Sequence, residues 1–150
     1  LMALCKAGDL EYAQNMLDSY WGAMLDLGAT TIWEQYDPSQ SIPAHYGMYG
    51  APYQKSLCHA WSSGPIYFLG RYCLGVYPTA PAYETYAIKP QAGIYQSFKG
   101  DVPTEKGNIH VEYDNGTVSV LSELEGGVLI VGGKEYAIEK DVLLKVEAEI

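Results

Sequence analysis

Apolar residues in the first part of the chain recur every three or four positions, which is the spacing of an amphipathic helix. These apolar positions are Leu10, Ala13, Leu17, Tyr20, Trp21 and Met24. Asp9 stands where a helix cap is expected and Gly28 where the helix should stop. Residues 1–7 fit the last turns of a preceding helix, so the pattern predicts a helical hairpin that turns at residues 7–9.

The residues after Gly28 favour an extended backbone and then a long loop. Residues 29–36 are rich in β-branched and aromatic side chains, which disfavour helix. Asp37–Lys55 holds three prolines, and a loop of this length in a compact domain is usually functional. A second helix is predicted from Ser56 to Tyr72, with two alternatives. Either it is kinked at Pro65, or it begins near Ser63 with Pro65 in its first turn.

From the proline-rich stretch of residues 75–81 onward, the pattern changes to period two, which indicates short strands. The predicted strands are residues 83–89, 94–99, 108–113, 117–122, 128–131, 134–138 and 142–147. Asp114-Asn115-Gly116 and Gly132-Gly133 are strong hairpin signals. We therefore predict a small antiparallel β-sandwich, and a domain boundary that separates residues 1–76 from residues 77–150.

Composition narrows the classes of partner and of site. The chain has 150 residues, 48% of them hydrophobic, and a formal charge of −9, which argues against binding nucleic acid or an anionic membrane. No apolar run approaches the roughly 20 residues of a membrane span. The three cysteines, Cys5, Cys58 and Cys73, have neither disulfide nor metal spacing. They are predicted to be buried free thiols, and we expect no cofactor.

Two short segments carry candidate chemistry. In the first, the carboxylate Glu34 stands beside Trp33 and Tyr36; in the second, His59 and Trp61 lie close together. Aromatic side chains suit sugar binding because their faces contact sugar C–H groups, although the 14 tyrosines equally suit a core. A single Glu or His is more often structural than catalytic. With no nucleophilic triad, phosphate loop or zinc motif, the residues alone indicate an aromatic cleft containing a carboxylate and a histidine.

Longer motifs resemble a known family. They are Y-W-G-A-M-L-D-L-G-A-T-T-I-W-E over residues 20–34, S-L-C-H-A-W over 56–61, G-V-Y-P-T-A-P over 75–81 and G-D-V-P-T-E-K-G over 100–107. In order and spacing they resemble the C-terminal part of the α-L-rhamnosidases of glycoside hydrolase family 78. The resemblance implies the last helices of an incomplete (α/α)6 toroid, followed by an antiparallel β-sandwich.

The resemblance also implies a reaction, namely hydrolysis of terminal α-L-rhamnosyl linkages in glycosides or polysaccharides, with inversion. It makes Glu34 the general base and His59 a sugar-binding residue, with Trp33 and Trp61 beside them as further substrate contacts. An inverting carboxyl pair stands roughly 6.5 to 9.5 Å apart, and the resemblance puts the general acid upstream of Leu1. We therefore expect a truncated, inactive piece that pairs with the upstream part of its protein or associates with itself.

Two alternatives are open at this point. The chain could be a non-catalytic carbohydrate-binding or structural module, although the predicted strands from residue 108 onward hold no cluster of aromatic residues for a sugar platform. It could also belong to a toroid enzyme that acts on another glycoside. The residues do not reveal the cellular compartment.

Overall fold

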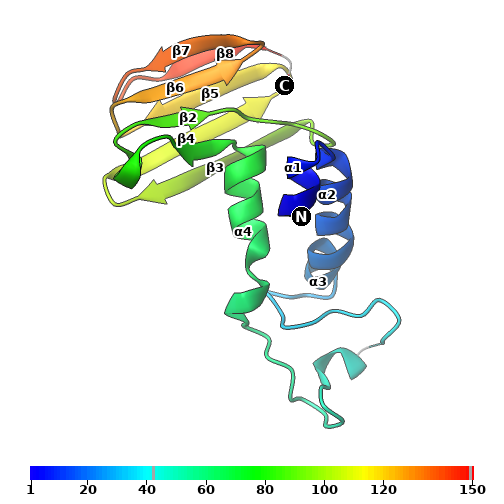
Figure 1. Cartoon of the computed structure of the whole chain (residues 1–150). Coiled ribbons are helices and arrows are strands. Elements are labelled where there is room, and N and C mark those ends of the chain that lie inside the picture. Colours follow the sequence, from blue (N-terminus) through cyan, green and yellow to red (C-terminus); the bar gives the residue numbers. More distant parts are fainter. Residues whose placement is uncertain (42, 149) are drawn as a thin grey trace. The chain divides into compact units, whose positions relative to one another are not determined.

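The computed structural model describes residues 1–41, 43–148 and 150, and the chain forms two compact units. The first unit, Leu1–Tyr67, consists of helices and a long loop (Figure 1). The second, Phe68–Ile150, contains the β-strands. The division falls upstream of the change in pattern after residue 76, and residue 42 of the predicted loop lies outside the described residues.

The predicted helical hairpin is confirmed. Helix α1 is Met2–Lys6 and α2 is Leu10–Leu17; α2 continues through a π-helical turn, η1, Asp18–Gly22, into α3, Ala23–Asp26. Asp9 caps α2, since its carboxylate accepts a hydrogen bond from the backbone N–H of Tyr12 at 3.2 Å. Gly28 ends the helix with a positive φ of 86°, a conformation that glycine adopts without strain.

The second predicted helix begins later than residue 56. A 3-10 turn, η3, covers Ala60–Ser62, helix α4 covers Gly64–Phe68, and a π-helical turn, η4, covers Leu69–Cys73. Pro65 lies in the first turn of α4, where its missing N–H costs nothing, so the second alternative is correct. The prediction of helix at residues 56–59 is wrong, because their backbone groups bond to an extended segment instead.

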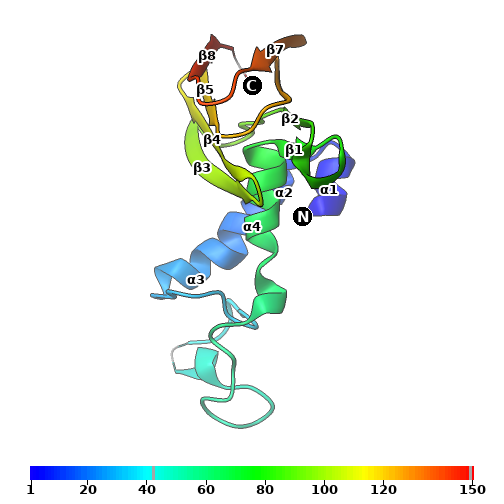
Figure 2. The ribbon, with the colours of Figure 1, turned by 90° about the vertical axis from the view of Figure 1, so that its left-hand side faces the viewer.

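The second unit is a β-sandwich, as predicted. Its strands are β1 Val76–Pro78, β2 Tyr86–Ile88, β3 Ser97–Thr104, β4 Gly107–Asp114, β5 Thr117–Ser122, β6 Gly127–Val131, β7 Lys134–Ile138 and β8 Leu144–Glu147. Within the described residues they form two four-stranded sheets, in the orders β1-β2-β6-β7 and β3-β4-β5-β8. The two layers are visible in Figure 2. All strand pairs are antiparallel except β2 with β6, which is parallel.

The sequence pattern missed one strand and predicted another too short. Strand β1 lies in the stretch predicted as a connector, and β3 extends beyond Lys99 to Thr104. The predicted turn at residues 114–116 is present between β4 and β5, with positive φ at Asn115 and Gly116.

The sandwich core is apolar and encloses a small group of buried polar contacts around Tyr86 and Ser122. Its fully enclosed residues come from both sheets and include Ile88, Leu129, Ile109, Val111, Val118 and Val120. The hydroxyl of Tyr86 donates to Ser122 Oγ at 2.6 Å, and burial raises the pKa of Tyr86 although this hydrogen bond acts in the opposite direction. A Cβ on Gly127 would meet the Tyr86 ring at 2.3 Å, so the ring packs directly on glycine backbone.

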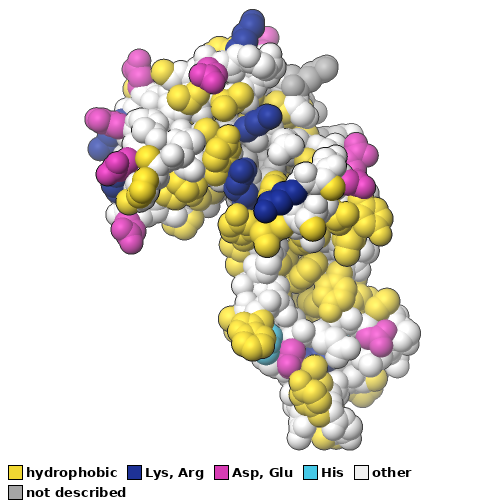
Figure 3. Space-filling view, in the orientation of Figure 1, with side chains coloured by type: hydrophobic (Ala, Val, Ile, Leu, Met, Phe, Trp, Pro, Cys, Tyr) yellow, Lys and Arg dark blue, Asp and Glu magenta, His cyan; other side chains and the backbone are white. Residues whose placement is uncertain are grey.

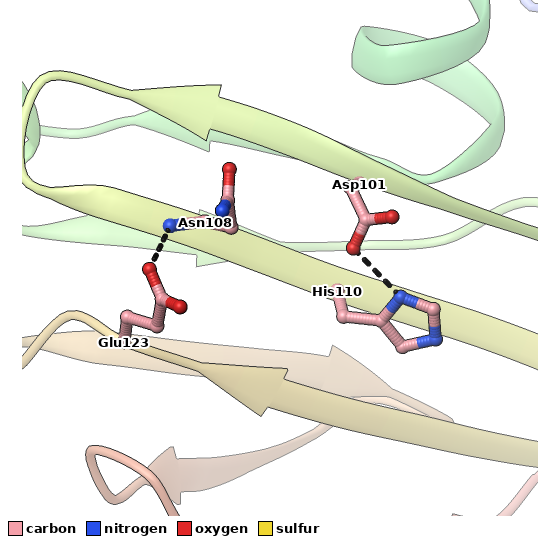
Figure 4. Close-up of polar contacts among 4 residues, drawn as sticks. All are labelled: Asp101, Asn108, His110 and Glu123. Carbon is pink, nitrogen blue, oxygen red and sulfur yellow. Dashed lines mark hydrogen bonds and ion pairs between the residues drawn. The ribbon is translucent and has the colours of Figure 1, made fainter.

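Polar contacts link β4 to its two neighbours in the β3-β4-β5-β8 sheet (Figure 4). Across β3 and β4, His110 Nδ1 lies 2.9 Å from Asp101 Oδ1. Glu123 accepts a hydrogen bond from the backbone N–H of Asn108 at 2.7 Å. His110, to which the sequence assigned no chemistry, is therefore one partner of an exposed cross-strand pair.

The cysteines differ from their prediction. Cys73 is a buried thiol, but Cys58 is exposed and Cys5 is only partly buried, with a pKa raised by that burial. Among the described residues, no helix has the length and apolar character needed to span a membrane.

Gly75, directly before β1, provides a test of the close packing between this residue and Lys89, directly after β2. Gly75 and Gly133 share a φ of +73°, but a Cβ would lie 1.9 Å from the Lys89 carbonyl oxygen at Gly75 and meet nothing within 4 Å at Gly133. We expect Gly133→Ala to lower the free energy of unfolding by about 1 to 2 kcal/mol. Gly75→Ala should lower it by roughly 3 kcal/mol or more, because backbone must also move. Chemical denaturation of the chain measures both, and equal losses would contradict this packing.

Candidate active site

The candidate residues lie on two backbone segments that are hydrogen-bonded to each other within the first unit. The backbone N–H of Glu34 donates to the Ser56 carbonyl at 2.9 Å, and that of His59 donates to the Ile32 carbonyl at 2.9 Å. The Thr31 hydroxyl adds a bond to the Leu57 carbonyl. The predicted extended segment at residues 29–36 thus pairs with residues 56–59 without forming a regular strand.

Glu34 is half-buried and held at three points. Besides its backbone N–H, its carboxylate oxygen Oε2 accepts from the Ser56 backbone N–H at 3.1 Å. Its carbonyl accepts from the Ser62 hydroxyl at 3.3 Å. Within the described part of the chain, the other carboxylate oxygen, Oε1, has no hydrogen-bond partner. The side chain is therefore fixed in place and keeps one oxygen available for an incoming proton.

His59 and Trp61 lie together at the end of the second segment. His59 has an extended backbone and precedes the turn η3, which contains Trp61. Their rings meet edge to face, with centroids 6.2 Å apart. Trp61 is 95% exposed, so the other residues of this chain leave its ring accessible to a ligand.

Trp33 has a different environment from Trp61. It is only 3% exposed and packs against Tyr46 and His45, with ring centroids 5.9 and 6.3 Å away. His45 in turn stacks on Tyr36 at 5.4 Å with nearly parallel rings. Trp33, predicted as a substrate contact, is thus enclosed by this chain's own aromatic residues and leaves almost no ring face open.

The π-helical turn η1 braces both segments. The indole N–H of Trp21 donates to the Ser62 carbonyl at 3.0 Å, and the Tyr20 hydroxyl accepts from the Tyr36 backbone N–H at 3.0 Å. π-Turns often occur at functional sites, and this one brings two neighbouring side chains to the segments that carry Glu34 and His59. Sequence reasoning had treated Tyr20 and Trp21 only as an apolar helix face.

The long loop contributes a buried charge that sequence reasoning also missed. Lys55 is 6% exposed, and burial lowers its pKa, partly offset by the carboxylates of Asp37 and Glu34. The pKa of Asp37 is lowered chiefly by hydrogen bonds from the Ser39 hydroxyl and N–H, at 2.7 and 2.9 Å, and further by His45 and Lys55. In the sequence, the one feature that could have drawn attention to Lys55 is its position directly before the S-L-C-H segment.

Among the described residues, no group of three or more His, Cys, Asp or Glu side chains is arranged to hold a metal ion. The two segments carry one anchored carboxylate, one imidazole and an exposed indole. The carboxylate can accept a proton, and the indole face can pack on apolar groups of a ligand.

The comparisons with known proteins agree on one family. Residues 1–73 match the family model described as the bacterial alpha-L-rhamnosidase 6 hairpin glycosidase domain. The chain also resembles the crystal structure of a GH78 family rhamnosidase of Bacillus sp. GL1, with 32% identity and a TM-score of 0.59. That match covers 80% of this chain and 12% of the length of the Bacillus protein. No curated protein matches.

The two tryptophans test this description of the site. We expect Trp33→Ala to lower the free energy of unfolding of the helical unit by about 3 to 5 kcal/mol, because it empties a packed aromatic cluster. Trp61→Ala should stay within about 0.5 kcal/mol, since the ring is exposed. Urea unfolding followed by circular dichroism measures both variants. A larger loss for Trp61→Ala than for Trp33→Ala would contradict the structure.

Proposed function

From the match of residues 1–73 to the rhamnosidase domain and the 32% identity with a GH78 rhamnosidase, we propose that this chain is part of a glycoside hydrolase family 78 enzyme. We propose further that this enzyme cleaves terminal α-L-rhamnosyl linkages with inversion, and that Glu34 is its general base. The observation that carries the proposal is the state of the Glu34 carboxylate. One oxygen is anchored by the Ser56 backbone N–H, and the other has no hydrogen-bond partner within the described residues. A base that activates water needs this combination of fixed orientation and free acceptor.

In the proposed reaction, the Glu34 carboxylate accepts a proton from a water molecule. The water oxygen bonds to the anomeric carbon on the face opposite the leaving group, while the bond from that carbon to the glycosidic oxygen breaks. A carboxylic acid from the part of the enzyme outside this chain protonates the leaving oxygen. The two carboxyl groups then stand roughly 6.5 to 9.5 Å apart, which leaves room for the water.

We assign the sugar contacts to the exposed side of the site. His59 donates or accepts a hydrogen bond with a sugar hydroxyl, and the open face of Trp61 packs on sugar C–H groups. Trp33, which is buried against His45 and Tyr46, is not assigned a contact with the sugar. Rhamnose-containing glycosides or polysaccharides are the proposed substrates.

The helices carry apolar surface that suits contact with further helices of a toroid. Tyr12, Met16 and Leu25 are exposed on α2 and α3, and apolar side chains gather on the visible face of the helical part (Figure 3). Soluble proteins rarely leave such patches in water. We propose that the remainder of the catalytic domain covers them in the whole enzyme, and that this chain alone is inactive.

Glu34 is tested in the full-length enzyme that contains this chain. We expect Glu34→Ala to reduce hydrolysis of an aryl α-L-rhamnoside by about 10³-fold or more, because no other group activates the water. Azide, which needs no deprotonation, should restore part of the rate and give the β-rhamnosyl azide. Proton NMR of the first product identifies the anomer.

Glu135→Gln, a change at an exposed carboxylate of the sandwich, provides the control and should keep the wild-type rate. An unchanged rate in Glu34→Ala would remove Glu34 from the mechanism. Initial release of α-rhamnose by the wild-type enzyme would exclude inversion.

The exposed apolar side chains of the helices give a second test, on the 150-residue chain alone. We expect the chain to associate at micromolar concentrations through these side chains, and light scattering measures the mass. The double variant Tyr12→Glu, Leu25→Glu should shift the distribution toward monomer. A monomeric wild-type chain would contradict the proposed role of this surface.

A further inference from the structure

The long loop ends in a small hairpin that leads directly into the candidate site. The backbone groups of Met48 and Ala51 bond to each other in both directions at 3.0 Å, and the Lys55 N–H donates to the Tyr46 carbonyl at 3.1 Å. Residues 46–55 therefore form a hairpin (Figure 1). The hairpin ends directly before the segment whose backbone anchors the proposed base.

Two tyrosines of this hairpin have an unusual backbone conformation. Tyr49 and Tyr53 have positive φ angles of 53° and 59°, in the left-handed region that is unfavourable for a residue with a bulky side chain. Both side chains are also highly exposed, 82% for Tyr49 and 74% for Tyr53, so burial of the rings does not offset this strain. Strained residues of this kind cluster at binding and active sites, which makes the two rings candidates for ligand contacts.

Tyr53 differs from Tyr49 in the support beside its ring. The rings of Tyr53 and Tyr46 are stacked, with centroids 6.3 Å apart and planes inclined by 19°. Tyr46 in turn packs edge to face on the buried Trp33, with centroids 5.9 Å apart. Within the described residues, Tyr49 takes part in no such ring contact. Tyr53 is thus the exposed end of a series of rings that starts at the residue directly before the proposed base.

The chain limits how far Tyr53 can lie from the Glu34 carboxylate. Ser56 follows Tyr53 by three positions, and three residues of extended chain span at most about 11 Å. The backbone nitrogen of Ser56 lies 3.1 Å from Oε2 of Glu34. The backbone of Tyr53 therefore lies within roughly 14 Å of the carboxylate. This separation suits a ligand of two linked sugar rings, with the first at the carboxylate and the second on the tyrosine.

We propose that Tyr53 is a specificity-determining residue whose exposed ring binds the sugar ring of the leaving group, so that the substrate is a glycan in which rhamnose is linked to another sugar. This inference rests on the proposed function. The ring face packs on C–H groups of the second sugar, and the phenol hydroxyl bonds to one of its hydroxyl groups. The stacked ring of Tyr46 limits the motion of Tyr53 before the sugar binds, which reduces the entropy lost on binding.

The test compares two kinds of substrate in the full-length enzyme that contains this chain. Rutinose and neohesperidose are disaccharides with α-L-rhamnose on glucose, whereas α-L-rhamnosyl fluoride has a leaving group too small to reach Tyr53. In Tyr53→Gly, kcat/KM for the disaccharide that the wild type cleaves faster should fall by about three- to tenfold, the effect expected from one ring contact. The value for the fluoride should stay unchanged. Tyr53→Phe, which keeps the ring, should retain most of the wild-type kcat/KM on both substrates.

Tyr49→Gly is the matched control. It removes a ring that is as exposed as that of Tyr53 and has a similar backbone strain, but that lacks the support of a second ring. Its kcat/KM should equal that of the wild type on the disaccharide and on the fluoride. A loss on the disaccharide as large as that of Tyr53→Gly would overturn the assignment of the contact to Tyr53.

Thermal stability separates this role from packing of Tyr53 against the rest of the enzyme. Glycine adopts a positive φ without strain, so Tyr53→Gly should keep a Tm close to that of the wild type. A lower Tm with equal losses on the disaccharide and the fluoride would show that the ring packs against protein, and would overturn the inference. Wild-type hydrolysis of the fluoride without hydrolysis of either disaccharide would overturn it as well.

Failure of the proposed function gives a different result. A wild-type enzyme that hydrolyses neither the fluoride nor the disaccharides is no rhamnosidase, which overturns the proposed function and this inference with it. Full activity of Glu34→Ala on the fluoride rejects the general base alone. If Glu34→Ala is inactive while Tyr53→Gly acts on both kinds of substrate like the wild type, the proposed function stands and the role of Tyr53 is rejected.

Discussion

The candidate site depends on the reciprocal hydrogen bonding of Glu34 and Ser56. The Glu34 N–H bonds to the Ser56 carbonyl, and the Ser56 N–H bonds back to the Glu34 carboxylate. Each bond adds only about 1 kcal/mol to stability, but together they define one orientation of a carboxylate on a segment without regular structure. The side chain gains this orientation while one oxygen stays free, so rigidity and reactivity do not conflict.

The same pairing explains which parts of the fold the sequence predicted. The helix from Leu10 to Asp26 and the strands β5 and β7 follow from local patterns, because one face of each packs on a core. Residues 56–59 do not, because their apolar spacing fits a helix while their backbone groups bond to a segment more than twenty residues away. Long-range backbone pairing of this kind has no local signature.

For the site, sequence reasoning selected the residues to which we assign the proposed chemistry and missed those that support them. Glu34 and His59 stand in a long motif, so resemblance alone was sufficient to select them. Trp33 and Trp61 looked equivalent as aromatic neighbours, yet one is buried and the other exposed. Tyr20 bonds to the backbone of Tyr36, sixteen residues away, and Lys55 is buried at the end of the long loop. Neither helix periodicity nor charge pattern distinguishes such residues from ordinary core or surface positions.

The long loop between α3 and α4 shows how a site can hold a group that the fold alone would exclude. Burial of the Lys55 ammonium has an unfavourable solvation term. The same loop holds favourable contacts, namely those of the His45 ring with Trp33 and Tyr36 and the backbone bond from Lys55 to Tyr46. The loop thus encloses a charged side chain directly before Ser56, the residue whose N–H anchors the carboxylate of the proposed base.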